Sequence, residues 1–278
     1  LNIAKDREII DKSVLQFVLA LGEQCFLNEY VYSITDEESI SLNKIINRCT
    51  DSELCETSIS ILACYYPLYK LIDKLPLLKS FTSINSSFKE LIKLQITEPL
   101  KEIELSKNII NLGPINNYVS QKVKTQYEEN PYPRWVTFGL VPDPLPSLET
   151  FRRLKLRFSE KVEVNFASPD ILVGGCGTGQ HSLQVASRYQ NCKVLAIDLS
   201  RASLAYAKRK SEELNCKNIN FIQGDLLDLR RLNKKFDIIE SVGVLHHMAN
   251  PIIGWEILTD CLKKDGLMLI GLYSKKAR

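Results

Sequence analysis

The chain has 278 residues, enough for two domains that each bury a hydrophobic core. With 45% hydrophobic and 25% charged residues and a formal net charge of +3, it has the composition of an ordinary globular protein. No apolar run reaches the length of a membrane span, and the first residues lack a signal-peptide pattern, so we expect no membrane span.

The eight cysteines are scattered along the chain, and no two of them form a C-x-x-C pair. Only three histidines accompany them, so the sequence does not predict a zinc site. Scattered cysteines in a chain of this size are typical of buried thiols in a reducing compartment. We therefore expect a cytoplasmic protein without a bound metal.

Charge is unevenly distributed between the two halves. Residues 1–115 carry 12 basic and 16 acidic side chains, whereas the remainder carries 24 basic and 17 acidic ones. This uneven charge has two interpretations. Either the two halves simply have differently charged solvated surfaces, or the basic side chains of the second half form a face for an anionic substrate. No dense basic run with interleaved aromatic residues is present, so nucleic acid is not indicated as a partner.

Residues 1–115 are predicted to form an all-α domain, because segments such as residues 13–26 place apolar side chains at helical spacing. Residues 116–169 are predicted to be a linker and possible cofactor lid. The proline clusters of this segment, at residues 130–135 and 141–146, are incompatible with the interior of a helix. The chain starts with Leu1 rather than Met, which suggests a piece of a longer protein.

Residues 170–278 alternate between strand-like and helix-like segments, which predicts an α/β fold with a doubly wound, mostly parallel sheet. A helix is expected to start at Asn250-Pro251 and to stop at residues 263–266, where two lysines precede an acid and a glycine. Five strands are expected, at residues 170–174, 192–198, 219–223, 236–242 and 267–273.

The first of these strands ends in the glycine-rich run Gly-Gly-Cys-Gly-Thr-Gly at residues 174–179. Glycines let a backbone turn sharply and approach a ligand closely, and a helix N-terminus favours negative charge. The spacing is G-x-G-x-G, with Gln180 where a dinucleotide-binding loop has its third glycine. The pattern predicts a ligand site at the carboxyl end of the strand.

An acid ends the second strand. Asp198 lies 19 residues after Gly179, close to the separation of about 20 residues that is typical of a ribose-binding acid. A carboxylate there can accept hydrogen bonds from both ribose hydroxyls, and Leu199 is its neighbour. The alternative is that Asp198 caps the helix that begins near Ser200, although Ser200 can do this itself.

Two further elements follow at the ends of the third and fourth strands. Asp225 is placed to accept a hydrogen bond from an adenine amino group while Leu226 packs against the ring; the alternative is an ordinary strand-end turn. The fourth element runs from residue 236 to residue 247 and includes Ser241, a further candidate cofactor contact.

The four elements resemble, in order and spacing, the successive motifs of class I S-adenosylmethionine (SAM)-dependent methyltransferases, over residues 170–273. The resemblance implies a Rossmann-like domain that is cut short after strand five, with SAM as cofactor. Val173 stands where the family often has an acid, so the contacts of that acid must come from elsewhere or be absent. The implied contacts are to the methionine moiety for Gly175, Gly177 and Gly179, to the ribose for Asp198, and to the adenine for Asp225 and Leu226. Cys176 and Leu199 are further candidate cofactor contacts.

Segments upstream resemble bacterial methyltransferases that carry tetratricopeptide repeats, although the repeats are absent here. The segments are residues 25–32, 63–68 and 126–135. In that family the region precedes the catalytic domain, and it implies no substrate.

Residues 126–135 are the candidate lid. Tyr127, with Tyr132 and Trp135, would face the sulfonium, because aromatic faces attract cations. Arg134 would bind the methionine carboxylate through two hydrogen bonds. The alternative is a packed connector anchored by its aromatic side chains.

His246 and His247 follow the fourth strand, where substrates of this family lie. A hydroxyl or amide acceptor would need a proton removed, and histidine has a suitable pKa. The alternative is that His246 packs and His247 is solvated.

The sequence therefore predicts an enzyme that transfers a methyl group from SAM to an unidentified acceptor, a small molecule or a protein. A non-catalytic SAM-binding or interaction module is the alternative. A nicotinamide-dependent oxidoreductase is a further alternative, which Gln180 in place of the third glycine opposes. The fifth strand would be an apolar sheet edge, which predicts a homodimer and weak turnover.

Overall fold

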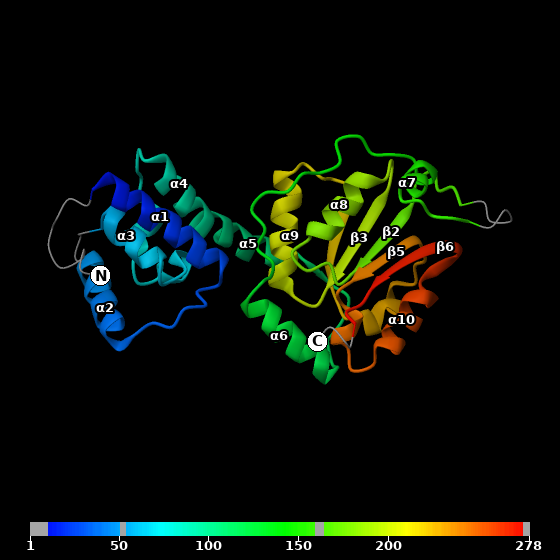
Figure 1. The fold of residues 1–278 in the computed structure, drawn as a ribbon. Helices are drawn as coiled ribbons and strands as arrows, with labels where there is room; N and C mark the ends of the chain where they lie inside the picture. Colours follow the sequence, from blue (N-terminus) through cyan, green and yellow to red (C-terminus); the bar gives the residue numbers. More distant parts are fainter. Residues whose placement is uncertain (1–10, 51–53, 159–163, 275–278) are drawn as a thin grey trace. The chain divides into compact units, whose positions relative to one another are not determined.

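The structure is a computed structural model, and it describes residues 11–50, 54–158 and 164–274. Two compact units make up the chain, Leu1–Lys101 and Glu102–Arg278 (Figure 1). The boundaries predicted at residues 115 and 169 do not coincide with this division and stay predictions. None of the helices that the structure describes is long and apolar enough to cross a membrane.

The first unit is built from short helices around an apolar core. Gln95 is fully buried at its centre, and its amide nitrogen donates hydrogen bonds to the carbonyls of Gly22 and Ala63 at 2.8 and 3.0 Å. A buried amide that is satisfied in this way fixes the helices it joins. The elements are α1 (Lys12–Leu27), α2 (Asp36–Thr50), α3 (Glu56–Ala63), η2 (Leu68–Leu71), η3 (Pro76–Lys79), α4 (Ser86–Ile92), the π-helix η4 (Lys93–Thr97) and α5 (Glu98–Lys107), which crosses the division.

The second unit alternates strands and helices, as the sequence predicts. Its strands are β1 (Ile110–Asn111), β2 (Asp170–Gly174), β3 (Lys193–Asp198), β4 (Ile219–Gln223), β5 (Phe236–Val242) and β6 (Leu262–Gly271). Its helices are α6 (Tyr118–Glu129), α7 (Ser147–Arg153), α8 (Gln180–Arg188), α9 (Arg201–Glu213), η5 (Leu226–Leu232), η6 (Leu245–His247) and α10 (Pro251–Asp260).

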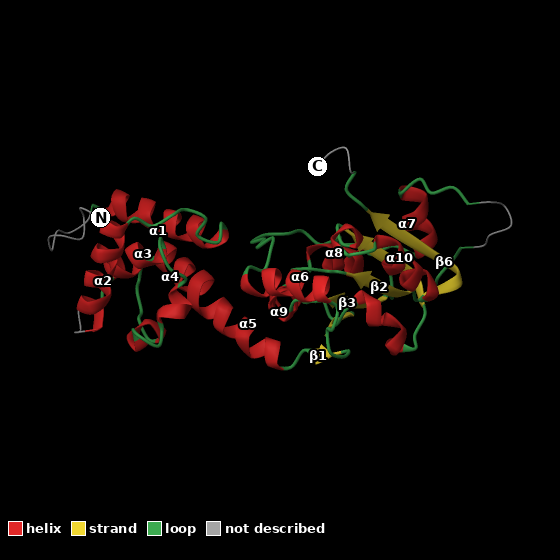
Figure 2. Cartoon of the chain, turned by 90° about the horizontal axis from the view of Figure 1, so that it is seen from below, coloured by secondary structure: helices red, strands yellow, loops and turns green. Residues whose placement is uncertain are grey.

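All neighbouring strands of the sheet are parallel, in the order β1-β4-β3-β2-β5-β6. This confirms the doubly wound α/β fold, with all five expected strands present. β1 corrects the prediction that residues 1–115 are purely helical. Ile110 lies opposite Ile222 of β4, and the backbone N–H of Leu112 donates to the carbonyl of Gln223 at 2.8 Å, so pairing with a distant strand creates β1. Figure 2 marks the position of this short strand after α5.

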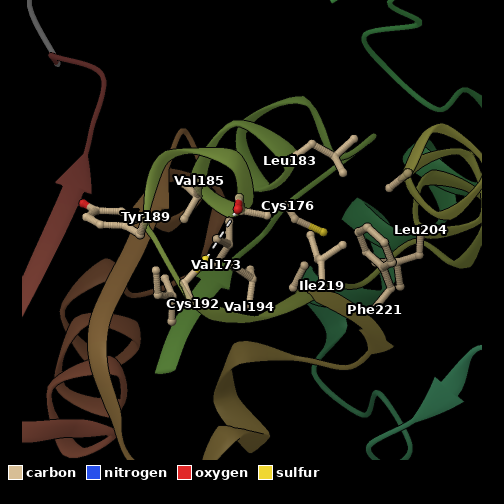
Figure 3. Packing of buried hydrophobic residues seen from close by; sticks show 14 of the residues in the cluster. Val173, Cys176, Leu183, Val185, Tyr189, Cys192, Val194, Leu204, Ile219 and Phe221 are labelled. Carbon is tan, nitrogen blue, oxygen red and sulfur yellow. Dashed lines mark hydrogen bonds between the residues drawn. The ribbon is translucent and has the colours of Figure 1, made fainter. Parts of the chain in front are cut away.

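Helices cover both faces of the sheet, with α8 and α9 on one face and α10 on the other (Figure 1). Side chains alternate between the faces along each strand. Val173 and Val194 pack toward Leu183 of α8 and Leu204 of α9 (Figure 3), whereas Leu172 packs on the α10 face. The carboxyl ends of β2 to β5 thereby converge on one edge of the sheet, where the site lies.

Two helices lie inside the segment predicted as a linker. α6 begins after Asn117, whose side chain accepts hydrogen bonds from the backbone N–H groups of Val119 and Ser120 at 3.0 and 3.1 Å. α7 follows the second proline cluster. The prolines therefore exclude a helix only at their own positions. α6 ends just before the first proline cluster, at residues 130–135.

The predicted helix stop at residues 263–266 is instead part of β6. Phe236 lies opposite Leu262 and Ile238 opposite Leu267, so the intervening residues of β6 form an irregularity in the pairing. Lys263 donates from Nζ to Asp237 at 2.9 Å, which holds this irregularity against β5. The helix start at Asn250 is confirmed, because its side chain accepts from the N–H of Ile252 at 3.0 Å.

Candidate cofactor site

The glycine loop after β2 is folded onto the end of β3. The backbone N–H groups of Gly175 and Cys176 both donate to the carbonyl of Ile197, at 2.8 and 3.0 Å. Gly175 and Gly177 adopt φ of 71° and 52°, in the left-handed region that favours glycine. A Cβ on Gly177 would meet only the carbonyl oxygen of Tyr132, at 3.9 Å, so this position leaves room for a ligand.

Asp198 is at the end of β3, beside this loop. Its Oδ2 accepts from the N–H of Gly177 at 2.8 Å, and its Oδ1 accepts from the N–H of Ser200 at 2.9 Å. Burial raises the pKa of Asp198, and the two backbone hydrogen bonds oppose that rise. Ser200 itself caps α9, accepting from the N–H of Ser203 at 3.0 Å, so Asp198 is not needed as a helix cap.

A cavity of about 370 Å³ opens between the loop, the strand ends and α6. Nine of the predicted site residues line it: Tyr127, Gly175, Cys176, Gly177, Asp198, Leu199, Asp225, Leu226 and His247. Asp225 is buried, and its Oδ1 accepts from the N–H of Leu227 at 3.0 Å, which orients the carboxylate at the start of η5. The motifs at the ends of the strands therefore line one and the same cavity.

Gly179 and Ser241 do not line the cavity. Gly179 lies at the start of α8 with φ of 88°, and a Cβ there would come within 2.5 Å of the Cβ of Ala207. This glycine is therefore required for the close approach of α8 to α9. Ser241 is fully buried in β5 and does not reach the cavity wall.

Arg134 is the main correction to the predicted site. Its guanidinium lies 3.7 Å from the carboxylate of Glu102 and 5.8 Å from the centre of the Tyr206 ring, and it does not line the cavity. Trp135 is also buried, and its Nε1 donates to the carbonyl of Thr178 at 3.1 Å. Both side chains hold the segment in place, as the connector alternative describes.

The rest of the candidate lid does border the cavity. Tyr127 and Tyr132 line it, and Thr178 donates from Oγ1 to the carbonyl of Pro133 at 2.7 Å. Glu128 accepts from the N–H groups of Arg201 and Ala202 at 3.1 and 2.7 Å, at the start of α9. The segment is thus both a wall of the cavity and an anchored connector.

The two predicted histidines occupy different positions. His247 lines the cavity, whereas His246 lies behind it. The ring centre of His246 is 4.2 Å from that of His247 and 4.4 Å from that of Tyr273. His246 therefore packs between two rings that border the site and does not itself face the cavity.

Sequence reasoning missed several lining residues. Val119 and Val123 precede Tyr127 at intervals of four residues, a spacing that places all three on one face of α6. That spacing is visible in the sequence and would have indicated these two valines as lining residues. His181, at the first turn of α8, and Tyr273 were also missed, and no local motif marks either of them.

The chemistry of the lining is mostly neutral and apolar. Burial raises the pKa of the Cys176 thiol well above its usual range, so this cysteine is a packing residue rather than a nucleophile. Across residues 11–50, 54–158 and 164–274, no group of three or more His, Cys, Asp or Glu side chains is placed to hold a metal ion.

A parallel sheet with a glycine loop, a helix and a strand-end acid around one cavity defines a Rossmann-like nucleotide-binding domain. Residues 170–278 match the family model described as "Methyltransferase domain". This part of the chain is therefore a class I SAM-dependent methyltransferase domain, which confirms the resemblance of the four motifs. The family model does not reach the N-terminal half, whose likeness to repeat-associated methyltransferases stays an expectation.

Known proteins are similar to part of this chain. An uncharacterised protein of Synechococcus sp. is 35% identical over 111 residues, which cover 40% of this chain and 27% of that protein. The probable (S)-tetrahydroprotoberberine N-methyltransferase 2 of Papaver bracteatum is 30% identical, over 34% of this chain and 26% of its own length. PKMT2 from Rickettsia typhi, solved in complex with AdoHcy, is 26% identical over 37% of this chain and 20% of its own, with a TM-score of 0.35. The chain spans about a quarter of the length of the first two relatives.

Proposed function

We propose that this chain transfers a methyl group from SAM to an acceptor that is not yet identified. The observation that carries the proposal is the placement of the Asp198 carboxylate on the wall of a cavity that the glycine loop also lines. The match of residues 170–278 to the methyltransferase domain family supports it.

The residues around the cavity fit SAM. Asp198 and Leu199 would hold the ribose, because a carboxylate accepts hydrogen bonds from neighbouring hydroxyls. Asp225 and Leu226 would hold the adenine, and the backbone around Gly177 leaves room for the methionine moiety. When bound, SAM supplies a methyl group on a sulfonium, and the walls need only align an acceptor with it and exclude water.

His247 is the residue we assign to the acceptor. It is exposed and lines the cavity beside the end of β5, and the ring of His246 supports it from behind. An acceptor that is already nucleophilic needs only to be positioned there. A hydroxyl or amide acceptor would in addition transfer its proton to His247.

The test begins with binding. Thermal unfolding is measured with SAM, with its demethylated product and with NAD, and transfer of a labelled methyl group is then followed with candidate small molecules and proteins. Stabilisation by SAM together with transfer supports the proposal. Stabilisation by SAM without transfer to any acceptor would indicate a binding module, and a response to NAD alone would indicate an oxidoreductase.

A cytoplasmic location is also part of the proposal. All eight cysteines are free thiols, and seven of them are at least partly buried. Thiols persist in reducing compartments. Fractionation of cells that express the protein would check this.

We further propose self-association through β6. This strand is last in the order of the sheet that the structure describes, and it pairs only with β5. Leu269 of β6 and Leu272 just after it are exposed, and an apolar strand edge invites pairing with another chain. Light scattering of the purified protein tests this: a monomer at all concentrations would exclude it.

A further inference from the structure

A buried carboxylate lies on β5 and faces α8. Glu240 of β5 is only 3% exposed, and it is directly opposite Val173 in the parallel pairing with β2. An ionised carboxylate buried there needs partners that compensate for its lost hydration. Val173 is the position at which the sequence lacks the acid common in related domains.

Both partners of Glu240 come from α8. Nε2 of His181 lies 2.6 Å from Oε2 of Glu240, and Nη1 of Arg188 lies 3.4 Å from Oε1. The two residues are seven positions apart, which places them on one face of the helix. Each oxygen of the carboxylate is therefore engaged by a different end of α8.

The network ends at the cavity wall. His181 lines the cavity with its side chain 29% exposed, next to the loop residues Gly177 and Thr178, whereas Arg188 does not line it. A purely structural cross-link between helix and sheet would not need to include a cavity-lining side chain. With Nε2 engaged by Glu240, Nδ1 is the ring nitrogen that remains to meet a ligand.

The distribution of charge in the cavity indicates what His181 meets. Asp198 and Asp225 lie at the ends of β3 and β4, where they suit hydroxyl and amino groups. Among the described residues that line the cavity, none is lysine or arginine, and Arg134 is bound to Glu102 instead. A ligand carboxylate therefore finds its cationic partner in a histidine, and His181 is the one beside the loop.

We propose that His181, oriented by Glu240, binds the α-carboxylate of the cofactor's methionine moiety. The ring in its doubly protonated form donates from Nε2 to Glu240 and from Nδ1 to the ligand. His181 contacts the ligand directly, and Glu240 is a positioning residue that acts through it. The inference rests on the proposed function, because it assumes that SAM occupies the cavity.

The test uses two ligands that differ only in this carboxylate, SAM and decarboxylated SAM. Dissociation constants for both are measured by calorimetry with the wild-type chain, His181→Ala, Glu240→Gln and Gln184→Ala. Gln184 is an exposed residue of the same helix and serves as the control. The wild-type chain should bind SAM with about ten- to hundredfold higher affinity than decarboxylated SAM. This is the preference expected when a charge-assisted hydrogen bond to the carboxylate is present in only one of the two complexes.

In His181→Ala the preference for SAM over decarboxylated SAM should fall to within about threefold. The preference should also fall in Glu240→Gln, whereas Gln184→Ala should keep the wild-type preference. A preference that survives in His181→Ala overturns the inference. Equal loss of affinity for both ligands also overturns it, because that is the result of a purely structural role. If the wild-type chain binds neither ligand, the proposed function fails instead.

Discussion

The carboxylate of Asp198 accepts a 2.8 Å hydrogen bond from the backbone N–H of Gly177. The bond ties the end of β3 to the glycine loop that follows β2, and both residues line the cavity. One side chain therefore shapes the loop and, in the function that we propose, also presents an acceptor to the ligand. Substitution at Asp198 should affect both properties.

We predict that Asp198→Asn weakens SAM binding about ten- to hundredfold, the loss expected for a hydrogen bond to a charged group. The amide can accept only through one atom, so the N–H of Gly177 or of Ser200 loses its acceptor. Calorimetric titration with SAM measures the effect, and Asp143→Asn, at an exposed position, is the control. An unchanged affinity would remove Asp198 from the site.

SAM affinity should also depend on pH through Asp198. Burial raises the pKa of this carboxyl, and the ionised form is the better acceptor for ribose hydroxyls. Affinity should therefore fall as the pH falls through the raised pKa, starting at a higher pH than for an ordinary aspartate. Burial also raises the pKa of the neighbouring Tyr127 and Cys176, so neither side chain ionises in this range.

Stability should respond to pH in the opposite direction. Because the folded state raises the pKa, it binds this proton more tightly than the unfolded state does. The unfavourable contribution of Asp198 to folding is present above the folded-state pKa and fades as the pH falls through it. Titrations and unfolding curves across pH, compared between the wild-type chain and Asp198→Asn, check both directions; superimposable profiles would contradict the assignment.

The glycine loop and Asp198 were predictable because their signal is local. A strand, three glycines and an acid 19 residues later lie within one stretch of sequence, and each residue type is dictated by backbone geometry or by charge. The five expected strands were likewise marked by continuous apolar runs, as is usual for strands buried on both faces.

The remaining parts of the site depend on contacts between residues far apart in the chain. The sequence suggests a cofactor contact for Arg134, but this side chain pairs with Glu102, 32 positions earlier, and no local pattern links the two residues. β1 exists only because β4 offers it an edge. The acid missing at Val173 was visible, yet its counterpart Glu240 could be found only from the strand register.

We predict that SAM slows hydrogen exchange in residues 126–135. Tyr127 and Tyr132 line the cavity, and the carbonyl oxygen of Tyr132 lies close to Gly177, so a bound ligand would restrict this wall. Peptide-level exchange measured by mass spectrometry with and without SAM tests it, with the peptide of α7 as an internal control. Identical exchange in both states would leave the segment as a connector alone.

Glu128 should link this segment to the stability of α9. Its carboxylate accepts from the N–H groups of Arg201 and Ala202, in the position of a helix cap with a favourable charge. Glu128→Ala should cost about 1 kcal/mol of unfolding free energy and weaken SAM binding, because α9 begins shortly after Asp198, which we propose to bind the ribose. Glu129→Ala, at the exposed next position, should change neither quantity. Equal effects of the two substitutions would contradict the capping role.

The most destabilising single substitution that we predict is Glu102→Ala. Glu102 is 8% exposed, and its carboxylate lies 2.8 Å from Nε of Arg209, which is itself 1% exposed, and 3.7 Å from Arg134. Removing one partner of a buried ion pair leaves an incompletely compensated charge, which typically costs about 3–5 kcal/mol. Glu213 also contacts Arg209 and should keep the loss toward the lower end of that range.

Urea unfolding followed by tryptophan fluorescence measures this loss selectively, because the only two tryptophans, Trp135 and Trp255, both belong to the unit Glu102–Arg278. Glu104→Ala is the control, since Glu104 is an exposed residue of the same helix and should shift the midpoint little. The segment of Arg134 also forms the cavity wall at Tyr132, so Glu102→Ala should weaken SAM binding as well. A midpoint that moves no further than that of Glu104→Ala would show that the arginines reach water or other acceptors when Glu102 is removed, and that this ion-pair network does not hold the segment in place.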